Sequence, residues 1–220
     1  MSIRPAALLL WILMGPAPAL LLAGDLAAEV RDRAGKPVAD AVILAVPTDG
    51  HAIRPQAHPR QEVDQVNLEF TPYVKVVPMG SEVYFPNKDN VRHQVYSFSP
   101  AKRFELPLYS GRSAPPVRFE KPGVVVLGCN IHDWMQAYVY VTDAPFYGQT
   151  GKDGKALLPN LPAGEYQIRV WHPRLKDPEQ ATLQRATLPA SGTLALHWDL
   201  TVGPDHRPRR RPDTGGSGYR

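Results

Sequence analysis

Residues 123–141 read Gly-Val-Val-Val-Leu-Gly-Cys-Asn-Ile-His-Asp-Trp-Met-Gln-Ala-Tyr-Val-Tyr-Val. The run from Val124 to Leu127 is apolar and rich in β-branched residues, and the run from Ala137 to Val141 has the composition of a second strand. The polar stretch between them, Cys129 to Met135, is therefore expected to be a loop that joins two strands. The side chains of such a loop lie close together in space.

Further strands are predicted on the N-terminal side of this loop. Polar and apolar residues alternate over Tyr73–Val77, Glu82–Phe85 and Gln94–Phe98, and turn residues separate these runs. Between positions 66 and 142 no amphipathic helical pattern occurs, and the 24 prolines of the chain disfavour long helices. The pattern predicts an all-β protein built around a β-sandwich.

The loop contains Cys129, the only cysteine among the 220 residues, which cannot form an internal disulfide. His132 and Met135 follow it at intervals of three residues, and His93 stands at the start of a predicted strand upstream. A thiolate, two imidazoles and a thioether are the donor set of a blue-copper electron-transfer site. We therefore predict that His93, Cys129, His132 and, as a weaker axial ligand, Met135 hold one type 1 copper ion that cycles between Cu(I) and Cu(II).

Each of these residues has a common structural role as well. A lone cysteine is more often a small buried residue, and a lone methionine more often fills a core. Structural zinc usually takes four Cys or His ligands, and here only three are present. A cysteine nucleophile beside His132 would need an oxyanion hole and an orienting third group, and neither is evident. The combination favours copper, and no enzymatic activity is expected.

The segments 76–90, His93-Gln94-Val95 and 124–141 resemble plastocyanin- and amicyanin-like cupredoxins, including exported proteins of the methylamine utilization type. The spacing Cys129-x-x-His132-x-x-Met135 is similar to the short ligand loop of amicyanin. The resemblance covers about the middle third of the chain, and it implies a Greek-key sandwich, periplasmic electron transfer and a solvent-edge position for His132. Gln94 stands where such proteins usually carry asparagine, so hydrogen bonds between the ligand loops are expected to differ. An apolar patch of Trp134, Pro107 and Leu108 is the expected docking surface for redox partners.

The segments on either side resemble the two halves of a carboxypeptidase-regulatory-like, transthyretin-type sandwich. Residues 30–46 are predicted to form a hairpin around the turn Ala34–Pro37, and 156–171 with 182–202 supply the later strands. We therefore expect this small sandwich to be interrupted by the copper region, although two consecutive domains are an alternative. The expected domain limits are 29–48 and 145–202 for the small sandwich and 62–143 for the cupredoxin.

The two ends of the chain have distinct compositions. Arg4 precedes apolar residues up to Ala23, which predicts a signal peptide within 1–28 and export to the periplasm, without stable membrane insertion after cleavage. The tail 203–220 is basic and rich in Pro, Gly and Ser, so it is expected to be disordered rather than a nucleic-acid-binding arm. The expected partners are redox proteins. The alternative function is a periplasmic copper-handling protein that is not an electron carrier.

Overall fold

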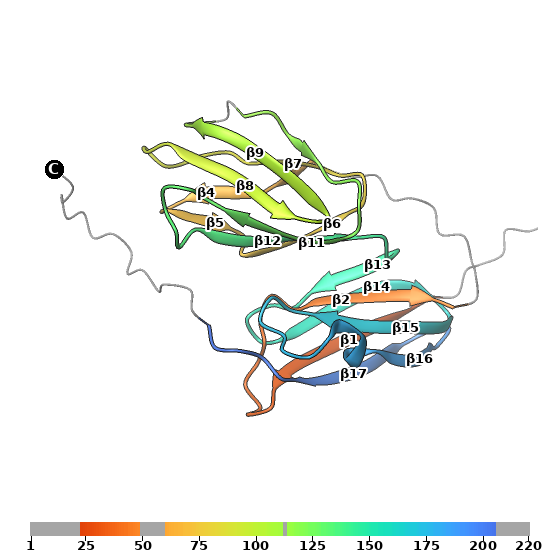
Figure 1. Ribbon diagram of the computed structural model, residues 1–220. Helices are drawn as coiled ribbons and strands as arrows, with labels where there is room; N and C mark the ends of the chain where they lie inside the picture. The colour runs from red at the N-terminus through yellow and green to blue at the C-terminus, as the bar shows by residue number, and fades with distance from the viewer. Residues whose placement is uncertain (1–22, 49–59, 112–113, 206–220) are drawn as a thin grey trace, which may run out of the picture.

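The computed structural model describes residues 23–48, 60–111 and 114–205, and nearly all regular structure in them is β-strand (Figure 1). The one helical segment in these ranges is a short 3-10 helix, η1 (Glu179–Thr182). The predicted all-β class is therefore confirmed. In the same ranges, no helix has the length and apolar character that a bilayer span needs. Most of the predicted signal peptide and tail lie outside the described residues.

Residues 61–142 form one sandwich, called here the central unit. One layer is a five-stranded sheet in the order β6 (Val74–Pro78), β12 (Gln136–Thr142), β11 (Gly123–Gly128), β8 (His93–Ser99) and β9 (Lys102–Tyr109). The other layer holds the sheet of β10 (Val117–Arg118), β7 (Glu82–Tyr84) and β3 (Gln61–Glu62), with the hairpin of β4 (Asp64–Val66) and β5 (Glu69–Thr71). β6 and β12 run parallel, whereas β12, β11, β8 and β9 pair in antiparallel fashion.

The core of the central unit follows from the strand period of two. Alternate residues of β11 and β12, among them Val125, Leu127 and Val139, point between the layers and are buried. Cys129 and Met135 belong to this same buried cluster. The predicted loop therefore starts and ends inside the core, so its ends are held by packing on both sides.

The remaining strands form a second sandwich, called here the flanking unit. Its sheets are β14 (Lys155–Pro162), β1 (Ala23–Asp32) and β17 (Thr193–Leu200), and β13 (Phe146–Gln149), β2 (Val42–Pro47), β15 (Gly164–Trp171) and β16 (Gln184–Leu188). Residues on both sides of the central unit in sequence thus share sheets and one core. The insertion hypothesis requires this pairing of β2 with β15, and the exact domain limits stay a prediction.

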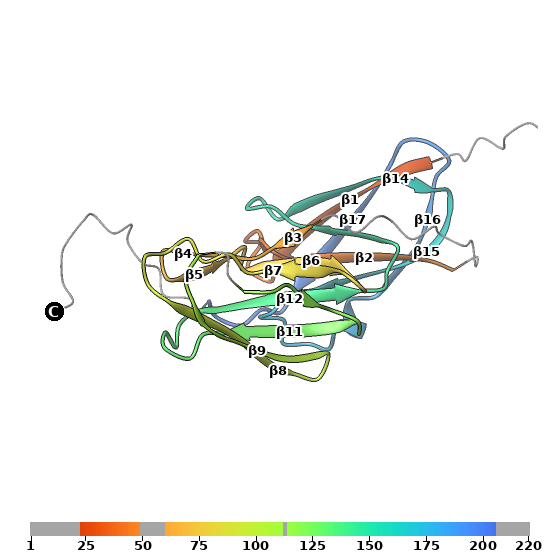
Figure 2. The same ribbon diagram turned by 90° about the horizontal axis from the view of Figure 1, so that it is seen from above.

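The two units pack against each other through the sheet of β6, β12 and β11 on one side and that of β13, β2 and β15 on the other (Figures 1 and 2). A third buried cluster fills this contact and includes Val42, Leu44, Val74 and Tyr140. β2 and β12 therefore have both faces buried, which explains the continuous apolar run Ala41–Ala45 in the sequence.

The predicted hairpin over 30–46 is wrong in its strand pairing. The turn at Ala34–Pro37 does form, with Gly35 at φ 79° and the backbone N–H of Asp32 donating to the carbonyl of Lys36. However, β1 and β2 lie in different sheets, because the chain turns again at Asp40 (φ 63°) and crosses over.

Three further segments differ from prediction. β9 was not predicted, because Pro107 lies within it; it is an edge strand, where a proline leaves no ladder partner unsatisfied. β3 and β4 lie in a polar stretch for which no strand was predicted. β1 begins at Ala23, so residues 23–28, expected to belong to the signal peptide, form the first part of a strand paired with β14 and β17.

Candidate metal centre

His93 is the first residue of β8 and is completely buried. It pairs in register with Tyr109 of β9, and a register shift follows directly after it, between His93 and Val95. The irregularity at the strand end changes the alternation of side chains at this point. The sequence signal for His93 was its place at the start of a predicted strand, and the structure puts it there.

Cys129 follows β11 directly and is 2 % exposed. The preceding Gly128 pairs with Tyr96 of β8, and a Cβ at position 128 would come within 2.8 Å of the Tyr96 ring. Glycine thus allows Tyr96 to cover the backbone beside the cysteine. This packing fixes the point at which the loop Cys129–Met135, called here the ligand loop, leaves the sheet.

The loop closes quickly after Cys129. The backbone N–H of Met135 donates to the carbonyl of His132 at 2.9 Å, and the Met135 side chain is again 2 % exposed. His132 is partly buried, and its ring centroid lies 5.3 Å from that of Trp134. The loop therefore places one imidazole near the surface and returns a thioether to the core.

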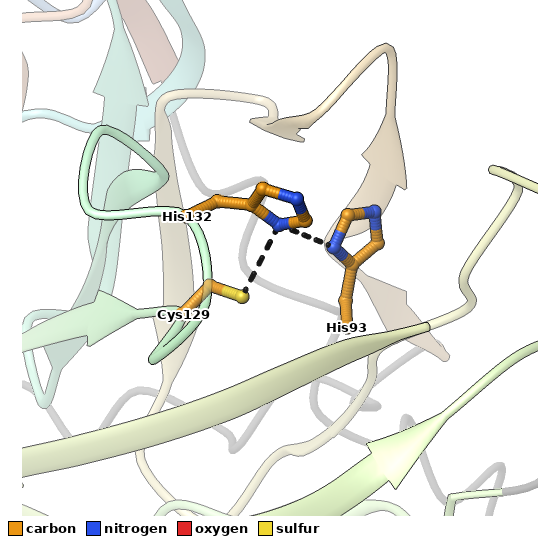
Figure 3. A group of neighbouring side chains, drawn as sticks. All are labelled: His93, Cys129 and His132. Carbon is orange, nitrogen blue, oxygen red and sulfur yellow. Dashed lines mark hydrogen bonds between the residues drawn. The ribbon is translucent and has the colours of Figure 1, made fainter. Parts of the chain in front are cut away.

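The structure brings His93, Cys129 and His132 together at one point (Figure 3). Nδ1 of His93 lies 3.1 Å from Nδ1 of His132, which lies 3.7 Å from Sγ of Cys129. The possible ligand atoms of the three residues are all within 4.8 Å of one another. Nitrogen and sulfur ligands sit about 2.0–2.3 Å from an ion of this kind, so one ion fits among them with little movement.

Met135 lies in the same region of the central unit as Cys129. It lies in the core cluster that contains Cys129, and both residues line a surface pocket of about 320 Å³. Tyr96, Phe98 and Asp133 also line this pocket. The pattern Cys-x-x-His-x-x-Met therefore brings Met135 into the same core cluster and pocket lining as Cys129.

Asp89 is a site residue that the sequence reasoning missed. Its Oδ2 lies 2.8 Å from Nε2 of His93, and its carboxylate accepts the backbone N–H groups of Asn67 at 2.6 Å and Leu68 at 2.9 Å. Burial alone would raise the pKa of Asp89, but the hydrogen bonds from Leu68, His93 and Asn67 outweigh it and hold the pKa below its usual value. The spacing of four residues to His93 was the one available signal.

Gln94 does not connect the ligand loops. Its Nε2 donates to Oε1 of Glu105 on the neighbouring strand β9 at 2.6 Å. The indole N–H of Trp134 donates instead to the backbone carbonyl of Leu68, at 3.1 Å. Gln94 was expected to alter the hydrogen bonds around the site. Its side chain bonds to β9, and the ligand loop contacts the β4–β5 hairpin through Trp134.

A buried polar group lies behind the cluster. Tyr109 and Gln65 hydrogen-bond to each other, and both donate to the carbonyl of Phe85. Burial raises the pKa of Tyr109 to about 12; the bond to Gln65 acts against this, and the nearby Cys129 adds to it. Tyr109 therefore stays protonated at neutral and moderately alkaline pH.

The proposed docking residues are at the surface. Trp134, Pro107 and Leu108 are all exposed, and the ligand loop exposes Ile131 as well. Trp134 is in ring contact with His132, so at least this part of the apolar surface adjoins the cluster.

No family model matches the chain, and no curated protein matches it. Among solved structures, a copper-containing nitrite reductase from Thermus scotoductus is 25% identical with a TM-score of 0.37, over 44% of this chain and 25% of that chain. A purple cupredoxin from Nitrosopumilus maritimus is 22% identical with a TM-score of 0.34, over 37% of this chain and 99% of that chain. The Cu(I) form of an amicyanin variant is 19% identical with a TM-score of 0.35, over 44% of this chain and 98% of that chain. This chain spans a quarter of the nitrite reductase. The choice of metal therefore rests on the donor atoms of this chain.

Proposed function

We propose that the protein is an exported carrier of single electrons that holds one type 1 copper ion through His93, Cys129 and His132, with Met135 as the axial ligand. The observation that carries the proposal is the convergence of two imidazole Nδ1 atoms and one thiol sulfur from two separate loops. Copper held by these groups would supply a Cu(I)/Cu(II) couple.

The protein contributes a rigid cage of mixed donors. Soft sulfur suits Cu(I), and imidazole suits both oxidation states, so the same donors can serve before and after electron transfer. His93 and Cys129 are buried and anchored at strand ends, which limits their movement when the charge changes. Zinc fits this set less well, because a structural zinc site would need a fourth Cys or His ligand, and among the described residues the group contains three.

The partly exposed edge of His132 is the proposed exit for the electron. The apolar side chains of Ile131 and Trp134 beside it give a surface on which a redox partner can dock without desolvating charges. The partners are proposed to be periplasmic redox proteins, in line with the apolar N-terminal segment of the sequence.

One observation favours a second function, the handling of copper without electron transfer. The pocket of about 320 Å³ reaches Cys129 and Met135 from the surface, and two sulfur atoms beside an opening would suit the uptake or release of Cu(I). Both functions use the same ligands. A fast electron self-exchange rate supports the carrier, whereas rapid loss of copper to a chelator and slow self-exchange support the handling protein.

The test is the visible and EPR spectrum of the protein after titration with Cu(II). We expect one equivalent to bind and to give an intense thiolate-to-copper band at about 600 nm with the narrow copper hyperfine splitting of a blue site. Cys129→Ser should bind copper without that band. Ser110→Ala, an exposed position outside the cluster, is the matched control and should keep the full spectrum.

A protein that stays colourless with Cu(II) would contradict the proposal, provided that its circular dichroism shows folded β-structure. A band of equal intensity in Cys129→Ser would contradict the ligand assignment.

A further inference from the structure

The carboxylate of Asp89 lies beside Nε2 of His93, a proposed ligand. Two backbone N–H groups already point at its carboxylate, which therefore acts as an acceptor toward the third neighbour, Nε2 of His93. The proton of the neutral imidazole then lies on Nε2, and Nδ1 keeps its lone pair on the side of Cys129 and His132. Of the two tautomers of His93, this is the one that can bind a metal at the cluster.

The tip of the β4–β5 hairpin supplies both backbone N–H groups. Its residues Asn67 (φ 57°) and Leu68 (φ 60°) adopt the left-handed conformation, which is unfavourable for leucine. This conformation aims both N–H groups at Asp89, and the carbonyl of Leu68 accepts the indole N–H of Trp134. Strain of this kind persists where surrounding contacts hold it in place.

Two loops that are distant in sequence thus meet on one hairpin tip. Asp89 leads to His93, and Trp134 lies between His132 and Met135 in the ligand loop. Gln94, which stands beside His93, is bonded to Glu105 on β9. The hairpin tip is therefore a second connection between the two ligand loops, in addition to the direct contact of Nδ1 of His93 with Nδ1 of His132.

We propose that Asp89 and the Asn67-Leu68 tip form a clamp, with Asp89 as a positioning residue that sets the tautomer of His93 and Trp134 as the attachment of the second loop. This inference deepens the proposed copper function and rests on it for the role of His93. The clamp is built from a carboxylate, two backbone N–H groups and one indole.

The first test reads the metal-free protein. Nitrogen-15 NMR of the histidine side chains should show His93 protonated on Nε2 and bare on Nδ1. Asp89→Asn replaces one carboxylate oxygen by an N–H₂ group, which must face one of the three donors: the N–H of Asn67, the N–H of Leu68 or Nε2 of His93. A population of His93 that is protonated on Nδ1 should therefore appear. The dissociation constant for Cu(I), measured by competition with a coloured chelator, should rise about 10–100-fold.

The matched control is Asp143→Asn, which removes the same charge from an exposed position outside the ligand loop and the pocket. It should leave the His93 tautomer unchanged and alter the Cu(I) affinity by less than about threefold. A wild-type His93 that carries its proton on Nδ1 overturns the clamp, as does an Asp89→Asn protein with unchanged tautomer and affinity. Because the tautomer is measured without metal, failure of the electron-carrier proposal gives a different result, a normal tautomer without a blue spectrum.

A double-mutant cycle tests whether the tip joins the two loops. Trp134→Phe keeps an aromatic ring but loses the N–H that reaches Leu68. If the tip transmits the constraint, the double variant Trp134→Phe/Asp89→Asn should raise the Cu(I) dissociation constant by less than the two single variants predict. The observed increase should be at least about twofold smaller than the product of the two single increases. Strictly multiplicative effects would overturn the link between the loops.

Discussion

At the scale of single residues, Met135 combines two roles that can be separated. Its side chain is 2 % exposed and belongs to the core of the central unit, and it lines the same pocket as Cys129, so the proposed role as axial ligand adds to a packing role. A thioether is weak and adaptable in both roles. A substitution that keeps the volume and removes the sulfur distinguishes between them.

We predict that Met135→Leu changes the copper couple and leaves the fold nearly intact. The free energy of unfolding of the metal-free protein should fall by less than about 1.5 kcal/mol, because the exchange conserves volume. The reduction potential should rise, because loss of a donor destabilises Cu(II) more than Cu(I). Urea denaturation and protein-film voltammetry measure the two quantities. An unchanged potential would show that Met135 only packs.

The sequence was sufficient to predict the candidate ligands but not the residues that support them. Cys129, His132 and Met135 were predictable because their spacing on one loop is itself a chemical pattern, and His93 because it starts an alternating strand. Asp89 gave no such pattern. Its role depends on backbone N–H groups at Asn67 and Leu68, about twenty residues away, which no side-chain motif encodes.

At the scale of elements, the turn before β14 holds the flanking unit together at a tight contact. Gly154 has φ 74°, and its carbonyl accepts the N–H of Val30 on β1. A Cβ at position 154 would lie 2.5 Å from the carbonyl oxygen of Val30 and 3.1 Å from Cβ of Pro37. The position therefore requires glycine for its backbone conformation and for its space.

We predict that Gly154→Ala destabilises the protein more than Gly35→Ala does. Gly35 has a similar φ of 79° but nothing within 4 Å of its would-be Cβ, so alanine there costs about 1–2 kcal/mol of left-handed strain. Gly154→Ala adds a clash with backbone atoms, expected to cost about 1–3 kcal/mol more. Urea denaturation of both variants gives the comparison, and equal losses would mean that the β1 contact yields without cost.

Strand prediction succeeded where local pattern and burial agree. β6, β8, β11 and β12 have alternating or apolar runs bounded by turns, and each was predicted within a few residues. β9 was missed because Pro107 argues against a strand unless its edge position is known, and the hairpin pairing of β1 with β2 was mispredicted because pairing depends on distant segments. Local sequence carries strand tendency, whereas sheet membership is a property of the whole chain.

At the scale of the whole molecule, the two sandwiches share a polar and aromatic contact in addition to their apolar one. Tyr140 of β12 donates to Glu179 in η1, and Glu179 forms an ion pair with Arg169 of β15 at 2.6 Å. The ring of Tyr140 lies 5.0 Å from that of Trp171. The central unit is thus attached to the flanking unit by the same strand that leaves the ligand loop.

This contact should weaken at alkaline pH. Burial, followed by the nearby charge of Glu179 and the bond to it, raises the pKa of Tyr140 above its usual value, so the folded protein keeps a proton that the unfolded chain releases near pH 10. Its contribution to the free energy of unfolding is complete below about pH 10 and declines above it.

We predict that Tyr140→Phe lowers the free energy of unfolding by about 1.5–3 kcal/mol at pH 8, and that this difference from wild type narrows by about 1 kcal/mol at pH 11. Denaturation curves at both pH values measure the change. A difference that is the same at both pH values would mean that Tyr140 loses its proton as easily in the folded protein as in the unfolded chain.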